Sequence, residues 1–114
     1  MVRQFEIWIA DLNPRIGTEP GKTRPVLIIQ TDLLNVANHP SSIICPISTN
    51  VKGDSEILRI HLKKGMSNLK MDCDVLIDQI RAIDNKRLIE KIGDLPNQFK
   101  SQIKENLLIV LDLE

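Results

Sequence analysis

Aromatic residues are scarce in this sequence: its 114 residues include two phenylalanines, one tryptophan and no tyrosine. Proteins that bind single-stranded nucleic acid by base stacking depend on several aromatic side chains along one groove. A stacking surface is therefore excluded as the main means of binding in this chain.

Histidine and cysteine are also scarce, with two residues of each kind. Cys45 and Cys73 show no metal-ligand spacing, and each lies among residues typical of a core. We expect two reduced, buried thiols and neither a disulfide nor a zinc site. The shortage of ligands argues against a metal enzyme, and we expect no cofactor.

Long apolar runs and an excess of one charge are missing as well. No run approaches the roughly 20 apolar residues of a membrane span, and the N-terminus lacks the apolar stretch of a secretory signal. We therefore expect no membrane partner and a cytoplasmic location. The formal net charge is zero, and 42% of the residues are hydrophobic, which is enough for a core. The length suits one domain over 1–114.

The sequence does contain a series of apolar segments with the period of β-strands. A short helical turn over 33–38, capped by Thr31 or Asp32, interrupts them. Pro46 has no backbone N–H, so it predicts that its strand lies at an edge or contains a bulge. The predicted strands cover 5–12, 24–30, 42–49, 55–62, two runs within 73–83, and 87–93.

The apolar period changes near the C-terminus, where Phe99 and Ile103 begin a helical spacing. Pro96 fits a helix start, with Asp94 or Asn97 supplying the capping oxygen. Strands first and one helix last predict an α+β fold, in which a C-terminal helix caps a curled antiparallel sheet.

The same helix carries more apolar residues than one face needs. Leu108 and Ile109 lie off its main apolar stripe. A domain of this size buries only a modest share of its surface. We expect part of the surplus to contact a second copy of the chain in a homodimer.

Charges are distributed unevenly along the chain, although they cancel in sum. The segment from Arg15 to Arg24 holds three cations and one acid, and the segment from Arg59 to Lys70 holds four cations and no acid. Either segment alone fits a solvated surface. Together they favour an anionic partner, and nucleic-acid phosphates are the commonest such partner.

Arg24 is a candidate phosphate-binding residue. It precedes Pro25, which biases Arg24 to an extended backbone at the entrance of a strand. A guanidinium is planar, always charged and able to fork onto two phosphate oxygens, and it binds a more negative transition state better still. The alternative is an ion pair with Asp11 or Asp32, and the spacing leaves both interpretations open.

Other polar residues stand close to predicted strand ends. Glu19 can act as a general base or simply face solvent. Ser48 and Thr49 end a strand with hydroxyls that can bind a phosphate oxygen or cap the next turn. Asp78 and Gln79 interrupt an apolar run, so they either organise a loop or face a site.

Four segments of the chain match a known pattern: EIWIADLNP, GTEPGKTRPVLIIQ, CPIST and DQIRAIDNKRL. They resemble the MazF/PemK family of toxin endoribonucleases from type II toxin–antitoxin systems. The resemblance implies a small SH3-like antiparallel β-barrel with a C-terminal α-helix, the CcdB/MazF/PemK-like fold, and a homodimer. It also implies metal-independent cleavage of single-stranded RNA at short sequences. The 2′-hydroxyl would attack its neighbouring phosphate and leave a 2′,3′-cyclic phosphate and a 5′-hydroxyl, so DNA is expected to resist cleavage.

The resemblance also assigns roles to residues. Arg24 matches the catalytic arginine, and Ser48 occupies a hydroxyl position that is usually threonine, with Thr49 beside it as a possible substitute. Glu19 matches an acidic loop residue that some members use. An arginine base would need a pKa shift of about five units, which costs about 7 kcal/mol. We therefore expect Arg24 to act as an electrostatic clamp, with Glu19 or a water as the base.

Two departures separate this chain from the PemK-like branch of the family. Asp78 aligns with an aspartate given a base role in that branch. The same branch has an arginine where this chain has Leu76 and a histidine where it has Thr18, so the Arg24/Ser48 arrangement is favoured. The residues expected to bind substrate are Thr18, Lys22, Thr49, Asp78 and Gln79.

The implied partners are single-stranded RNA and a cognate antitoxin, an acidic and partly disordered protein that competes with RNA. One alternative is a non-catalytic toxin of the same fold that binds a protein such as gyrase, as CcdB does. Another is a nucleic-acid-binding module without activity. The intact R-P-V and P-I-S segments favour the ribonuclease.

Overall fold

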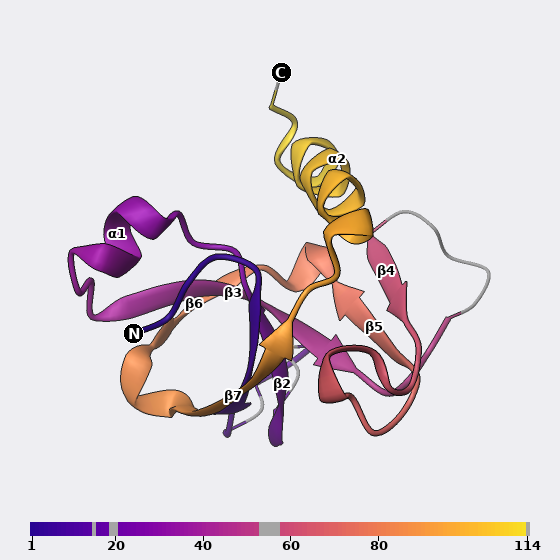
Figure 1. Ribbon diagram of the computed structural model, residues 1–114, viewed down its shortest axis with the longest axis horizontal. Helices are drawn as coiled ribbons and strands as arrows, with labels where there is room; N and C mark the ends of the chain where they lie inside the picture. The colour runs from indigo at the N-terminus through magenta and orange to yellow at the C-terminus, as the bar shows by residue number, and fades with distance from the viewer. Residues whose placement is uncertain (15, 19–20, 53–57, 114) are drawn as a thin grey trace.

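Within the part of the chain that the structure describes, the apolar segments form seven strands, and the C-terminal segment forms the main helix (Figure 1). The computed structural model describes residues 1–14, 16–18, 21–52 and 58–113. Its strands are β1 (Glu6–Asp11), β2 (Thr23–Ile28), β3 (Ser41–Ser48), β4 (Arg59–Leu62), β5 (Cys73–Leu76), β6 (Arg81–Asp84) and β7 (Leu88–Asp94). Its helices are α1 (Asp32–Val36) and α2 (Lys100–Leu111), with 3₁₀ turns η1 (Met66–Asn68), η2 (Ile77–Gln79), η3 (Asn85–Arg87) and η4 (Asn97–Phe99).

The strands pair in the order β4-β5-β3-β2-β1-β7, and β6 pairs with β3 beside this path. All of these pairs are antiparallel. The predicted α+β class, an antiparallel sheet with a C-terminal helix, is confirmed. The predicted strand runs are confirmed too, except that residues 55–57 lie outside the described residues.

Strands β4 and β7 end the path among the described strands, so the sheet is not closed by a ladder. The η1 turn bridges the gap instead, because Asn68 Nδ2 donates to the Ile92 carbonyl at 2.6 Å. Ser67 Oγ likewise donates to the Asp94 carbonyl. A Cβ added at Gly93 would lie 2.7 Å from the Ser67 carbonyl oxygen, so only glycine allows this close approach. A loop therefore holds the seam of a barrel-like sheet.

Pro46 lies inside the sheet, which corrects the predicted edge or bulge. On one side of β3 it faces Val26 of β2. On the other side, the pairs with β6 run to Ile44 and the pairs with β5 begin at Ile47. Pro46 falls between two partner strands, where its missing N–H interrupts neither ladder.

Both faces of β2 are covered, as its unbroken apolar run predicts. Leu27 belongs to one core cluster, which also contains Ile7 and Ile103. Val26 and Ile28 belong to a second cluster on the other face. All of these side chains are fully buried. The strand that carries Arg24 is therefore fixed from both sides.

The two cysteines are buried and free, as predicted. Burial, together with the nearby charge of Asp78, raises the pKa of Cys45 to about 12. Burial also raises the pKa of Cys73. Both thiols therefore stay protonated and serve as core side chains.

The two helices begin in different ways. Thr31 caps α1, because its hydroxyl accepts a hydrogen bond from the Leu33 N–H at 3.3 Å. The N-cap of α2 is Phe99, and no side chain caps this helix. The predicted caps Asp94 and Asn97 are therefore wrong, because the η4 turn leads directly into the helix and replaces a side-chain cap.

Helix α2 extends away from the sheet toward the C-terminus (Figure 1). Ile103 anchors it, since this side chain is fully buried in the core. The later residues Leu108, Ile109 and Leu111 are exposed. No helix in the described ranges is long and apolar enough to cross a membrane.

Candidate active site

The polar candidates converge where β2 begins and β3 ends. These strands are antiparallel, and their register pairs Val26 with Pro46. Extending this register by two residues sets Arg24 opposite Ser48. A cavity of about 620 Å³ opens at this place. It is lined by Thr18, Gly21, Lys22, Thr23, Arg24, Pro25, Ile47, Ser48, Thr49, Asn50, Arg59, Leu76 and Gln79.

The loop before β2 positions two of the cations. Arg24 Nε donates to the Gly21 carbonyl at 2.8 Å, which sets the direction of its half-buried side chain. Lys22 has a φ of 68°, an uncommon backbone for a residue with a side chain. Its N–H donates to Asn13 Oδ1 at 2.8 Å, and its carbonyl accepts from the Leu12 N–H at 2.9 Å. These bonds stabilise a loop that brings both cations to the cavity.

Ser48 serves the turn and remains available to the cavity. Its Oγ accepts a hydrogen bond from the Asn50 N–H at 3.1 Å. A hydroxyl that accepts in this way still has its own proton to donate. Thr49 also lines the cavity and is exposed. Either hydroxyl can therefore donate to an anion in the cavity.

The remaining predicted site residues divide into three groups. Thr18 and Gln79 line the cavity. Asp78 is exposed and does not line it. Glu19 lies outside the described residues. The structure thus brings together six of the eight predicted site residues.

The cavity is cationic. Lys22, Arg24 and Arg59 all line it, and none of its described lining residues is acidic. Arg and Lys side chains attract phosphate groups, and Arg binds them bidentately. The described part of the chain contains no group of three or more His, Cys, Asp or Glu placed to hold a metal ion. The arrangement can bind an anion by charge and by hydroxyl donors.

Arg59 and its partner Asp74 were not among the predicted site residues. Asp74 lies on β5 opposite His61, and Arg59 is two residues earlier on the facing strand β4. The signal in the sequence is a carboxylate within the apolar run CDVLI, together with two basic residues at strand spacing. A buried acid on one strand needs such cations on its neighbour.

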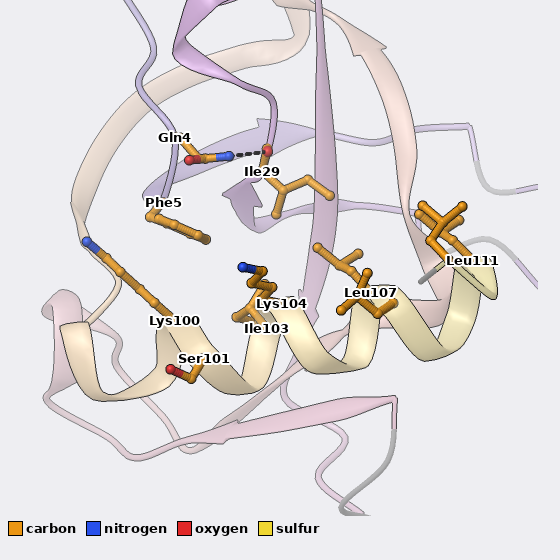
Figure 2. A pocket seen from close by; sticks show the side chains of 11 residues that line it. Gln4, Phe5, Ile29, Lys100, Ser101, Ile103, Lys104, Leu107 and Leu111 are labelled. Atoms are coloured by element: carbon orange, nitrogen blue, oxygen red, sulfur yellow. Dashed lines mark hydrogen bonds between the residues drawn. The ribbon is translucent and has the colours of Figure 1, made fainter.

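A second hollow has a different character (Figure 2). This apolar groove has a volume of about 430 Å³. Lys100 and Lys104 also contribute to it, and Lys100 Nζ lies 5.3 Å from the centre of the Phe5 ring. The apolar groove is lined by Gln4, Phe5, Ile29, Lys100, Ser101, Ile103, Lys104, Leu107, Leu108, Leu111 and Leu113.

The chain is similar in sequence to a known bacterial endoribonuclease. The chain is 32% identical over 113 residues to the endoribonuclease EndoA of Bacillus subtilis strain 168. The match covers 99% of this chain and 97% of EndoA.

Solved structures with the same fold extend this similarity. MazF of Deinococcus radiodurans has a TM-score of 0.82 at 21% identity, covering 98% of this chain and 97% of that chain. An endoribonuclease from a mycobacterial species, in complex with its cognate antitoxin, has a TM-score of 0.79 at 14% identity. This match covers 100% of this chain and 98% of that chain. The family described as PemK-like, MazF-like toxin of type II toxin-antitoxin system matches residues 3–111. With nearly its whole length matched, the chain belongs to this toxin family.

Proposed function

We propose that the chain, acting as one domain over 1–114, is a toxin endoribonuclease that cleaves single-stranded RNA at specific short sequences without a metal ion. The observation that carries this proposal is the meeting of Arg24 and Ser48 in one cationic cavity. The likeness to the endoribonuclease EndoA supports the same activity.

The proposed reaction uses a nucleophile that RNA itself supplies. The 2′-oxygen forms a bond to the adjacent phosphorus while the bond to the 5′-oxygen breaks. A base takes the 2′-hydroxyl proton, and the leaving 5′-oxygen receives a proton. The products are a 2′,3′-cyclic phosphate and a 5′-hydroxyl. DNA lacks the 2′-hydroxyl, so it is not cut.

Arg24 stabilises the charge that develops on the phosphate in this reaction. Its Nε bond to Gly21 fixes its direction before substrate arrives, so little reorganisation is needed. Ser48 donates to a non-bridging oxygen, and Thr49 can take over this bond. Glu19 or a water acts as the base. Arg24 remains protonated, because deprotonating it at neutral pH costs about 7 kcal/mol for five pKa units.

The other lining residues bind the RNA on either side of the reacting phosphate. Lys22 adds charge, and Thr18 and Gln79 offer hydrogen bonds from the cavity wall. Asp78 is exposed and outside this wall. Its part in substrate binding stays a prediction.

The decisive experiment is cleavage of one long RNA by the purified chain in EDTA. The parent should give a defined ladder, and sequencing of the fragments should reveal a common short motif. End-group analysis should find 2′,3′-cyclic phosphate and 5′-hydroxyl termini. Arg24→Ala should cut at least about 100-fold more slowly, as when one charge-stabilising donor is removed.

Lys86→Ala is the matched control, since it removes an exposed cation that lines neither the cavity nor the apolar groove. It should cut like the parent. A parent that cuts nothing would overturn the proposal and favour a toxin that binds a protein such as gyrase. If Glu19→Ala cuts as fast as the parent, a water is the base and the role of Arg24 stands.

We further propose two protein partners. A second copy covers part of the exposed apolar surface of α2, where Leu108 is 37% and Ile109 57% exposed. A cognate antitoxin with an acidic, partly disordered segment occupies the cationic cavity and excludes RNA. The antitoxin-bound mycobacterial endoribonuclease of the same fold supports this second partner. Sedimentation at micromolar concentration tests the dimer, and inhibition of cleavage by the antitoxin tests the complex.

A further inference from the structure

A carboxylate with no solvent exposure lies behind the cationic cavity. The side chain of Asp74, on β5, is 0% exposed. Its Oδ2 accepts from the Lys52 N–H and from Arg59 Nη1, both at 2.9 Å. Its Oδ1 lies 2.5 Å from Nδ1 of His61. Burial alone would raise the pKa of Asp74, but these hydrogen bonds hold it below its usual value, so the carboxylate is charged.

This carboxylate fixes the side chain of Arg59. Nη1 of Arg59 donates to Asp74 and also to the Asn50 carbonyl at 2.9 Å. Both bonds leave from one nitrogen and orient the fork of the guanidinium, and among the described residues no hydrogen bond is made by Nε or Nη2. The side chain is 21% exposed and lines the cavity that holds Arg24 and Ser48. Arg59 is thus a rigid donor and not a mobile surface cation.

Arg59 also lies at the border between two cavities. It lines the cationic cavity and a neighbouring cavity of about 420 Å³, which His61 and Phe99 also line. The cationic cavity alone has a volume of about 620 Å³, within the range of sites that hold drug-sized ligands and so larger than one phosphate requires. The cavity therefore has room for a second phosphate beside one bound at Arg24, and Arg59 lines the same cavity.

We propose that Arg59 binds a backbone phosphate that flanks the scissile one, and that Asp74 is the positioning residue that holds Arg59 in place. This inference rests on the proposed ribonuclease function. A guanidinium that is already held at Nη1 loses little freedom when a phosphate binds its other nitrogens. The ligand is therefore a phosphodiester of single-stranded RNA outside the reacting bond.

The first test is the salt dependence of binding. The probe is an RNA that carries the mapped cut site with one 2′-deoxy residue at the cut, so that it binds without reacting. For single strands, the slope of log affinity against log salt falls by about 0.7 for each phosphate contact. Arg59→Gln should make the slope shallower by about 0.7. Asp74→Asn should keep the parent slope, because the cation remains, while the affinity drops several-fold.

The second test locates the phosphate. Neutral methylphosphonates replace the phosphates on either side of the cut, one at a time. At one flanking position, the methylphosphonate should weaken RNA binding by the parent but should not weaken binding by Arg59→Gln any further. Such a result is a coupling between Arg59 and that phosphate in a double-mutant cycle. Arg59→Lys should recover part of the charge effect but not the full affinity, because ammonium cannot fork. Lys86→Gln should show no coupling at any position.

Folding is checked in parallel, since Arg59→Gln removes a partner of the buried Asp74. The double variant Arg59→Gln/Asp74→Asn removes both charges and repeats the test if the single variant unfolds. A parent that neither binds nor cuts RNA overturns the proposed function itself. A parent that cuts RNA, with an unchanged salt slope and no coupling in folded Arg59 variants, overturns only the role of Arg59.

Discussion

The cationic cavity and the apolar groove under α2 differ in how their walls are held. The walls of the cationic cavity come from strand ends and a loop, with cations fixed by a carbonyl and a buried carboxylate. The walls of the apolar groove come largely from one face of a helix whose outer leucines are exposed (Figure 2).

The contrast separates two kinds of energy. Hydrogen bonds and ion pairs hold side chains in fixed orientations, so the cationic cavity suits a reaction in which the reacting groups must be oriented. Apolar area is not directional, so the groove suits stability and association. A substitution in one region should therefore change a property that a substitution in the other leaves alone.

The largest expected effect is on stability and lies beneath the groove. Ile103→Ala removes a fully buried side chain from the main core cluster. It should lower the free energy of unfolding by about 3 kcal/mol, as large-to-small core substitutions do. Urea denaturation measures this loss. The rate of RNA cleavage per folded molecule should stay within about twofold, and a larger fall would show that the two regions are coupled.

The next effect is on chemistry and lies in the cationic cavity. Ser48→Ala removes a donor to the phosphate, and we expect cleavage to slow by about 10- to 100-fold, which corresponds to about 1.4 to 2.7 kcal/mol. Ser48→Thr keeps the hydroxyl and should cut like the parent. Single-turnover cleavage measures both. Equal rates for alanine and threonine would show that Thr49 supplies the hydroxyl.

A smaller effect is on association. Leu111, which lines the groove, is 47% exposed, and Leu111→Glu should weaken the proposed dimer at least about tenfold because it places a charge in an apolar contact. Sedimentation over a range of concentrations measures the change. Leu33→Glu is the matched control, since Leu33 is 79% exposed on α1 and lines neither hollow. Equal shifts for the two variants would remove the groove from the interface.

The smallest effect is the dependence of stability on pH. The native pKa of Asp74 is lowered, so its charge stabilises the fold above the ordinary aspartate pKa of about 4. That contribution is lost as pH falls through the lowered native pKa. Between pH 5 and pH 3, the melting temperature of the parent should fall further than that of Asp74→Asn. The variant should still lose some, because the pKa values of Glu6 and Asp32 are lowered as well.

The sequence predicted most of the scaffold because each strand has its own apolar pattern. It also placed Arg24 and Ser48 at strand ends through the R-P-V and P-I-S segments, and both line the cationic cavity, while their roles in catalysis stay predictions. The position of Pro46 was mispredicted, since nothing local in the sequence says that β3 changes partners at that residue. The cap of α2 was mispredicted because a 3₁₀ turn can replace a capping side chain.

The pair of Arg59 and Asp74 escaped prediction for a different reason. The two residues are on separate strands, and only the register of β4 with β5 brings them together. Arg59 was grouped by sequence with a basic segment, in which Lys63 and Lys64 are exposed. The burial of Asp74 is what distinguishes Arg59 from these lysines, and burial depends on the assembled sheet.

Arg24 and Arg59 reach their shared cavity from opposite flanks of β3, one through β2 and the other through β4 and β5. The β5 flank is joined to β3 by two residue pairs, Ile47 with Val75 and Ser48 with Asp74. A ladder this short bends more easily than a long one, and bending it moves one guanidinium relative to the other. If both guanidiniums bind RNA phosphates as proposed, substitutions at these two residue pairs offer a way to alter substrate choice without changing either arginine.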